Sequence, residues 1–369
     1  MSTEEVQARV MTGRTWDEFC DRLKAAGQTI LRPEAPASEI DRAEGWRYLS
    51  RLTRIALEMM LEHADPDFPV FYSASHATAK IGADNPDNLY LNATLSGDRE
   101  YRVRGSRGTV PTLSFGTKAN RYATEGTMAS TGELDGRNLI VNADGSFEIA
   151  VSRERRAGNW LPLAADSSLL IVRQTFLDRA REVPATVTIE CVNAPSHPEP
   201  LAARALDRGL MAAAAFVGGT ARTFADWAQR FQASPNSLET LDQGVFIRAG
   251  GDPNIFYLHG YWRIAPDEAL VIDTPVPECE TWNFQLNNYW MESLDYRYLS
   301  VSVNKRTARY NADGSVTLVV ASCDTGVGNF IDTAGHTSGT MLLRWTRADR
   351  HPVPACRVVK LASLTRKTD

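Results

Sequence analysis

The sequence predicts a mainly β protein in which a helical N-terminus and a helical connector accompany two antiparallel, jelly-roll-like β-sandwich domains. Short segments alternate apolar and polar residues at period two, which is typical of half-buried strands. Glycine and proline between these segments favour antiparallel sandwiches. One pattern of residues occurs twice in the same order, which indicates an internal duplication. We therefore expect a helical segment at 1–65, sandwiches at 66–195 and 241–369, and a helical connector at 196–240.

Three segments outside the predicted sandwiches have helical patterns. Residues 15–31 and 39–64 carry apolar side chains at helical spacing, and Ser38 is placed to act as the N-cap of the second segment. Residues 199–232 also have a helical pattern, which we expect to break near "VGGT" at 217–220. Beyond about residue 352 a proline interrupts the chain, and "CRVVKLASL" then predicts a last strand.

The duplication rests on four matches that keep their order along the chain. Each match places a residue or motif of the first half opposite the same residue or motif in the second half. The matches are "NPDNLYL" (85–91) with "DPNIFYL" (252–258), which sets Tyr90 opposite Tyr257; "NADGS" (142–146) with "NADGS" (311–315); "GNW" (158–160) with "GNF" (328–330); and Arg173 with Arg344.

The "NADGS" motif predicts a hairpin turn in each copy, because Asp-Gly allows the backbone to adopt positive φ. In the first copy it separates "NLIV" from "FEIAV", and in the second it separates "TARY" from "VTLVV". "LYLNATL" and "FEIAVS" alternate apolar and polar residues and predict strands of the first sandwich.

Composition excludes several classes of function. The formal net charge of -5 argues against a nucleic-acid partner, which requires a basic face. The start of the chain lacks the order of a signal peptide, and the longest apolar run, at 210–219, is too short to cross a bilayer. The five cysteines show neither a disulfide framework nor zinc-site spacing. We expect a cytoplasmic protein without a membrane partner.

Four stretches resemble bacterial proteins that carry the domain of unknown function numbered 1214, a domain often found with a companion numbered 1254. The resemblance covers about residues 40 to 350 and implies jelly-roll-like β-sandwich domains, but it implies little about chemistry. The stretches are "GADNPDNLYLNATLSGDREYRVRG" (82–105), "GNWLP" (158–162), "WNFQLNNYWMESLDYR" (282–297) and "GNFIDTAGHTSGTMLLRW" (328–345).

The last of these stretches contains a candidate acid–base pair. His336 can carry a proton in either direction near neutral pH, and Asp332 could orient its ring. The first copy has Pro162 and Asp166 at these two positions, which favours the second copy as the working half. Asn329 lies at the start of the same loop. In the alternative, His336 caps a turn or contacts a backbone carbonyl.

Residues 282–300 combine aromatic and amide side chains in an unusual density. In a continuous strand, Trp282 and Trp290 would share one face with Asn288, while Gln285 would take the other. This composition suits a pocket that stacks a flat or cyclic ligand and binds its oxygen atoms. The alternative is an internal polar network that joins two sheets.

Two further groups are candidates with structural alternatives. Glu292 and Asp295 could form a carboxylate pair for acid–base catalysis, or Arg297, Arg309 or Arg344 could neutralise them. His259 occupies the place of Asn92 of the first copy, and it either lines the same pocket or is a satisfied core residue.

These features favour a cofactor-independent enzyme that acts on a small ring-containing substrate by a lyase, isomerase or hydrolase step. His336, Asp332 and Glu292 are its predicted catalytic residues. The predicted substrate-binding residues are Trp282, Gln285, Asn288, Trp290, Asn329, His259, Arg297 and Arg344. We expect no cofactor and no metal, a small-molecule substrate, and a chain that could form a homodimer. The alternative is a non-catalytic β-sandwich protein that binds a carbohydrate or another small ligand.

Overall fold

The computed structural model describes residues 1–364, and it confirms the predicted fold class: mainly β, with four sheets and a helical N-terminus. The helices are α1 (Thr3–Met11), α2 (Arg14–Ala26), α3 (Glu39–Leu57), α4 (Ala203–Phe231) and α5 (Gln243–Arg248). A π-helical turn at Glu58–Glu62 prolongs α3. Among the described residues, no helix combines the length and apolar character that crossing a membrane requires.

The first half of the chain forms two four-stranded sheets, ordered β1-β7-β3-β4 and β6-β5-β2-β8. Every neighbouring pair is antiparallel except β5 with β6, which is parallel. The strands are β1 (Asn88–Thr94), β2 (Tyr101–Ser106), β3 (Thr112–Arg121), β4 (Thr127–Asp135), β5 (Ser146–Ser152), β6 (Asn159–Pro162), β7 (Leu169–Thr175) and β8 (Thr186–Cys191).

The second half repeats this arrangement strand for strand. Its sheets are ordered β10-β16-β12-β13 and β15-β14-β11-β17, and β14 with β15 is again a parallel pair. The strands are β10 (Ile255–Arg263), β11 (Glu268–Thr274), β12 (Thr281–Leu286), β13 (Ser302–Asn304), β14 (Val316–Ala321), β15 (Asn329–Asp332), β16 (Ser338–Thr346) and β17 (Ala355–Lys360), and a short β9 (Ser237–Thr240) precedes them. The two halves thus have the same topology.

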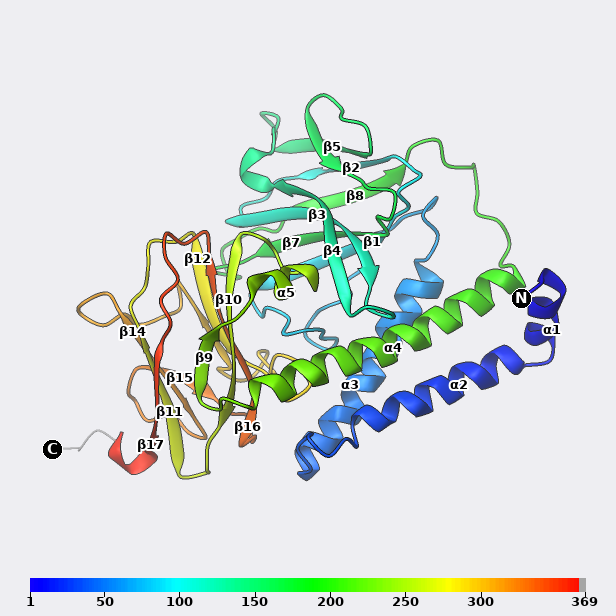
Figure 1. Cartoon of the computed structure of the whole chain (residues 1–369). Coiled ribbons are helices and arrows are strands. Elements are labelled where there is room, and N and C mark those ends of the chain that lie inside the picture. Colours follow the sequence, from blue (N-terminus) through cyan, green and yellow to red (C-terminus); the bar gives the residue numbers. More distant parts are fainter. Residues whose placement is uncertain (365–369) are drawn as a thin grey trace.

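The protein has three main hydrophobic cores. One lies between the two sheets of the first sandwich, and a second lies between the two sheets of the second sandwich. The third joins the helices to the remaining faces of β1-β7-β3-β4 and β10-β16-β12-β13. Figure 1 shows α4 crossing beneath the sandwiches with α2 and α3 alongside it. The helices therefore cover the region where the two halves meet.

The N-terminal helices form much as predicted, whereas the predicted break in α4 is wrong. Ser38 caps α3, and its side chain accepts a hydrogen bond from the backbone N–H of Asp41 at 3.2 Å. α4 continues without interruption through Gly218 and Gly219. A Cβ at Gly219 would lie 2.4 Å from the carbonyl oxygen of Tyr122. The glycine therefore permits close helix–loop packing instead of ending the helix.

The turns predicted at "NADGS" form, but the segments before them are not strands. In both copies the glycine adopts positive φ, and β5 or β14 begins at or just after the motif. The long strand predicted at 282–300 is also wrong, because β12 ends at Leu286. The chain then forms a loop closed by a bridge between Asn287 and Ser293, so the predicted period-two faces do not extend beyond the strand.

The two adjacent glycines of α4 provide a matched stability test. We expect Gly219→Ala to lower the free energy of unfolding by about 1–3 kcal/mol, because its Cβ would overlap the backbone of Tyr122. Gly218→Ala should raise the same free energy by about 0.5–1 kcal/mol, because its nearest neighbour would lie at 3.9 Å and alanine favours helix. Urea denaturation measures both. Equal effects of the two substitutions would contradict the close packing.

Candidate functional site

A cavity of about 170 Å³ lies between the two sandwiches and α4, and we call it the central cavity. Strands β1, β7, β10 and β16 contribute polar groups to its wall, whereas α4 contributes mainly aromatic ones. The polar lining includes Asp84, Asn85, Asn88, Tyr90, Asn92, Arg173, Tyr257, His259 and Arg344; the apolar lining includes Met59, Met128, Leu169, Ile171, Phe216, Phe224, Trp227, Phe246 and Leu342.

Each half contributes one tyrosine and one arginine at corresponding positions. Tyr90 of β1 lies opposite Arg173 of β7, and Tyr257 of β10 lies opposite Arg344 of β16. The phenol oxygen of Tyr90 accepts a hydrogen bond from the backbone N–H of Asn85 at 3.0 Å. That of Tyr257 accepts one from Asp252 at 2.8 Å. Since both phenol oxygens act as acceptors here, each hydroxyl hydrogen remains available to donate to another group.

The two arginines cross between the halves in a reciprocal way. Nη2 of Arg173 donates to the carbonyl of Gly250 in the second half at 2.5 Å. Nη2 of Arg344 donates to the carbonyl of Ala83 in the first half, also at 2.5 Å. Each acceptor lies seven residues before the tyrosine of its own half. The two sandwiches are therefore joined by two equivalent contacts, each between an arginine on a strand of one half and a loop carbonyl of the other.

Neither buried guanidinium has an ionic partner. Nη1 of Arg344 lies 2.5 Å from Oε1 of Gln285 and 3.4 Å from Oδ1 of Asn283, and both acceptors are uncharged. Nη1 of Arg173 is buried without any hydrogen-bond partner. In residues 1–364, no carboxylate lies within 4.0 Å of either group. Because arginine stays protonated in proteins, two positive charges remain without contact neutralisation.

Burial and neighbouring groups act in opposite directions on these charges. Burial lowers the pKa of Arg344 below its ordinary value. Burial also acts to lower the pKa of Arg173, but Asp252 and the nearby phenols outweigh it, so that pKa is raised. The carboxylate of Asp252 accepts a hydrogen bond from Ser114 at 3.2 Å and another from the backbone N–H of Asn254. Asp252 therefore stabilises the guanidinium at a distance instead of pairing with it.

Two other carboxyl groups near the arginines are satisfied by neutral donors. Asp84 accepts hydrogen bonds from the backbone N–H and the hydroxyl of Ser293, and burial raises its pKa. Asp87 accepts one from Asn304 at 3.1 Å, and burial raises its pKa to about 6. Burial therefore weakens the negative charge of both carboxyl groups.

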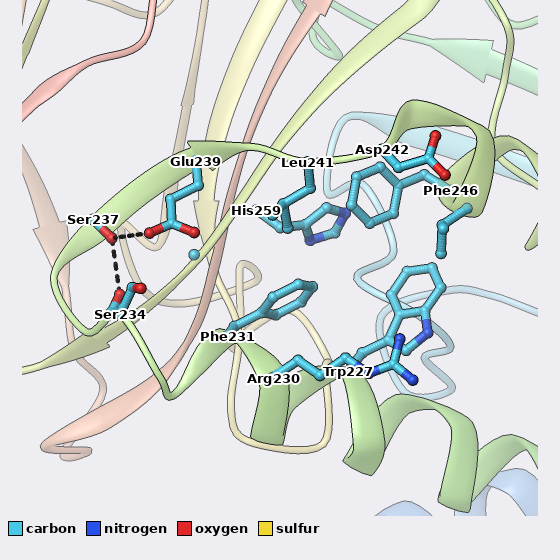
Figure 2. A pocket seen from close by; sticks show the side chains of 12 residues that line it. Trp227, Arg230, Phe231, Ser234, Ser237, Glu239, Leu241, Asp242, Phe246 and His259 are labelled. Atoms are coloured by element: carbon cyan, nitrogen blue, oxygen red, sulfur yellow. Dashed lines mark hydrogen bonds between the residues drawn. The ribbon is translucent and has the colours of Figure 1, made fainter.

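His259 lies between the central cavity and a second cavity of about 190 Å³ that we call the outer pocket. Figure 2 shows the outer pocket with the rings of Trp227, Phe231, Phe246 and His259 around it. Burial, reinforced by Arg344, lowers the pKa of His259 to about 3. The imidazole is therefore neutral at physiological pH, with one nitrogen as donor and the other as acceptor.

Three of the predicted site residues converge on the central cavity. Arg344 and His259 line it, and Gln285 lies directly behind Arg344 as a hydrogen-bond acceptor. Gln285 also donates to the carbonyl of Asp84 at 2.8 Å. Its role is thus to position Arg344 and the loop of the first half.

His336 belongs to a different, buried cluster. Its Nδ1 lies 3.4 Å from Asp41, and its Nε2 lies 3.2 Å from Glu44 outside hydrogen-bond geometry. Both carboxylates come from α3, so the predicted pairing with Asp332 is wrong: Asp332 instead accepts from the backbone N–H of Ala334. Burial opposes the charge of His336, but Asp41 and Glu44 raise its pKa to about 9. His336 lines neither the central cavity nor the outer pocket.

Asn288, Trp290 and Glu292 lie in the same buried cluster. Asn288 donates to Glu44 at 2.8 Å and to Glu292 at 3.0 Å. Glu292 pairs with Arg51 of α3 at 2.6 Å, and the indole of Trp290 donates to the backbone of α3. Burial raises the pKa of Glu292. These contacts favour the alternative interpretation, in which the polar residues connect α3 to the second sandwich.

The remaining predicted residues do not contribute to either cavity. Trp282 is fully buried in the core of the second sandwich. The side chain of Asn329 forms hydrogen bonds with the backbone of Arg309 and with β14. Asn159 bonds the backbone of Ile140 and β5 in the same way in the first half. Arg297 pairs with Asp295 at 2.6 Å on the surface. These residues stabilise local structure.

The sequence analysis did not assign Tyr90, Arg173, Trp227 and Phe246 to a site. The repeat already set Tyr90 opposite Tyr257 and Arg173 opposite Arg344. Both copies keep the same tyrosine and the same arginine although much of the surrounding sequence differs, and this was the signal that could have indicated the site. Nothing in the sequence linked Trp227 or Phe246 to these positions, because only the tertiary fold brings the connector to the strands.

The His336 cluster gives a pH-dependence prediction. The folded-state pKa of about 9 exceeds the ordinary value of 6.5, so its stabilising contribution is complete below about pH 6.5 and is lost as the pH rises through 9. We expect the free energy of unfolding to fall over that interval by up to about 3 kcal/mol. Urea titrations across the interval should show a smaller fall in His336→Gln. The exposed control His197→Gln should behave as the unmodified protein does, and an unchanged fall in His336→Gln would contradict the assignment.

The family described as "Protein of unknown function (DUF1214)" matches residues 90–175. No curated protein matches the chain. The chain is similar to an uncharacterized protein from Burkholderia cenocepacia whose crystal structure is known, with 54% identity and a TM-score of 0.95 over 96% of this chain and 99% of that one. The VPA0106 protein from Vibrio parahaemolyticus is similar in fold alone, with 12% identity and a TM-score of 0.50 over 86% of this chain and 98% of that one.

These comparisons confirm the resemblance to the domain numbered 1214 and leave the companion domain numbered 1254 as a prediction. The identity to the Burkholderia protein extends over both sandwiches and the helices, well beyond the residues that the family description matches. The chain therefore belongs to the same family as that uncharacterized Burkholderia cenocepacia protein, and it carries the DUF1214 domain of unknown function.

Proposed function

We propose that this protein binds a small organic anion in the central cavity. The observation that carries the proposal is the pair of guanidinium groups of Arg344, which is buried, and Arg173, which is half-buried with a buried Nη1; within residues 1–364 their hydrogen-bond acceptors are uncharged. An unpaired buried charge costs free energy, and a carboxylate or phosphate would remove that cost by binding to the planar donor fork of arginine. The unpartnered Nη1 of Arg173 supports a direct contact with such a group.

The opposite wall of the cavity suits the apolar part of the ligand. Phe216, Phe224 and Trp227 project from α4, and Met128 and Leu342 add apolar surface from the sheets. Aromatic side chains favour ring-containing partners through stacked and edge-to-face contacts. We therefore propose a ligand with an anionic head and an apolar, ring-containing body.

We also infer that the two halves arose by internal duplication. The shared strand order supports this origin, and so do the reciprocal arginine contacts across the cavity. Duplication supplies a reason for two arginines to converge on one cavity, because each half would bring its own copy to the surface that both halves share.

Substitution of the arginines tests the anion site. We expect wild-type protein to bind benzoate in isothermal titration calorimetry, and Arg173→Gln to bind it about tenfold to hundredfold more weakly, since a hydrogen bond to a charged group contributes about 1.5–3 kcal/mol. Arg173→Lys should retain part of the affinity, because it keeps the charge but not the fork.

The control for this test is Arg153→Gln, which alters an exposed arginine of the first sandwich. Its affinity for benzoate should equal that of the unmodified protein. Equal affinity in Arg173→Gln and Arg153→Gln would exclude Arg173 from the site. Failure of several small carboxylates and phosphates to bind wild-type protein would reject the proposed function.

The tyrosines support a second candidate function, a cofactor-independent lyase, isomerase or hydrolase. Their phenol oxygens already accept backbone hydrogen bonds, so their protons are available to a substrate held by the arginines. Burial raises the pKa of Tyr257 to about 12, so this phenol is protonated at neutral pH and can donate a hydrogen bond to an oxygen atom of the substrate. This assignment replaces His336, which lies outside both cavities.

Turnover distinguishes the enzyme from a binding protein. We expect Tyr257→Phe to retain benzoate binding through Arg173 and Arg344 but to lose conversion of substrates, which liquid chromatography with mass spectrometry detects after incubation with a mixture of small organic acids. Tyr289→Phe is a suitable control, because Tyr289 is a buried phenol that does not line the central cavity. Conversion that persists in Tyr257→Phe would contradict the proposed role of Tyr257, and absence of conversion in the wild type would favour binding alone.

A further inference from the structure

The outer pocket shares part of its wall with the central cavity. Trp227, Phe246 and His259 line both of them. Figure 2 shows these three side chains together with Phe231 around the outer pocket, with Glu239 and Asp242 at its edge. These three side chains therefore form a wall common to both cavities, and rotation of their rings is the movement that would connect the two.

His259 lies in this shared wall with one unsatisfied polar atom. The residue is only 4% exposed, and its Nδ1 has no hydrogen-bond partner among the described residues. Within residues 1–364 its contacts are with rings: Phe231 stacks on it at 5.0 Å and Phe246 lies at 4.5 Å, both measured between ring centroids. A neutral imidazole carries one donor and one acceptor, and leaving either unpaired costs about 1–3 kcal/mol. A polar ligand group at this point would recover that free energy.

The outer pocket itself favours a ring. Trp227 meets Phe246 and Phe231 edge to face, at interplanar angles of 69° in both pairs. Leu241 and Val245 complete the apolar part of the lining, and the charged side chains that also line the pocket, Arg230, Glu239 and Asp242, are exposed. Arrays of this kind bind another aromatic ring through the same stacked and edge-to-face geometries.

We infer that the central cavity and the outer pocket form one bipartite site for an anion of the N-aroyl amino acid type. The inference rests on the proposed function, because the carboxylate of the ligand binds Arg173 and Arg344. A hydrogen-bonding linker such as an amide then passes His259, and an aromatic ring occupies the outer pocket beside Phe231. The three parts of the ligand match an anionic site, a polar wall and an aromatic pocket, in that order.

Three probes and two substitutions test the inference. Hippurate joins a carboxylate to a phenyl ring through an amide, phenylbutanoate replaces the amide by methylenes, and propanoate lacks the ring. Leu241→Trp fills the outer pocket, and His259→Phe removes the polar atoms while keeping an aromatic ring. Ile140→Trp, at an exposed position of the first sandwich, is the matched control for a large added side chain.

We expect Leu241→Trp to weaken hippurate and phenylbutanoate binding by about tenfold or more, because the ring loses its apolar environment, and to leave propanoate binding unchanged. His259→Phe should weaken hippurate by about threefold to tenfold and should not weaken phenylbutanoate, since only hippurate can bond the imidazole. Isothermal titration calorimetry measures all of these affinities. Ile140→Trp should leave them at wild-type values.

The outcomes separate this inference from the proposed function. If Leu241→Trp leaves the binding of all three probes unchanged, the bipartite site is overturned and the anion site stands. Equal weakening of all three probes by Leu241→Trp also overturns it, because the substitution then acts on the central cavity or on the fold. Absence of binding of every carboxylate to wild-type protein overturns the proposed function, and the bipartite site with it.

Discussion

The arrangement of this protein depends on two hydrogen bonds between its halves, one made by Arg173 and the other by Arg344. Each guanidinium extends from a strand of its own half and donates to a backbone carbonyl at the start of the other half. Across the same boundary Ser114 donates to the carboxylate of Asp252, and Asn283 donates to Asn85. Polar contacts therefore join the two sandwiches directly, beside the apolar core that connects both of them to the helices. A polar boundary of this kind leaves room for a ligand.

The helices complete this boundary from one side. α4 packs against β10 and β16 of the second sandwich, and its residue Gly219 approaches the chain after β3 of the first. α3 is fixed to the second sandwich by the buried cluster that includes His336, Glu44 and Arg51. Charges are frequent in this cluster because it orients a helix against a loop, and each charge there has an opposite partner or a neutral donor. The charges around His336 thus have opposite charges or neutral donors in contact with them, whereas the two arginines at the cavity have no carboxylate in contact among the described residues.

Much of the fold could be predicted from the sequence, because it follows from local patterns. Alternation gave β1 and β5, capping gave the start of α3 at Ser38, and the repeat gave two sandwiches of equal topology. The extent of β12 could not be predicted in this way. Beyond Leu286 every residue up to Leu294 is buried, so a period-two pattern of burial is absent and the alternation of residue types misleads.

The candidate site was predicted only in part, for a related reason. Gln285, Arg344 and His259 were identified by their chemistry, and they do lie together. His336 was also chosen for its chemistry, but its partners come from Asp41 and Glu44, which lie far away in the sequence. The prediction of His336 relied on a difference between the two copies, so it favoured residues that the copies do not share. The residues at the cavity are mainly those that both copies kept, since the surface that the halves share is the part of each half that must fit the other.

One difference between the halves has a consequence for any molecule bound between them. Tyr90 and Arg173 of one half correspond to Tyr257 and Arg344 of the other, so both halves offer the same polar groups to a bound molecule. The halves differ where Asn92 of the first half is replaced by His259 in the second, because of these two residues only His259 also lines the outer pocket. This one substitution therefore gives the two sides of the central cavity different surroundings.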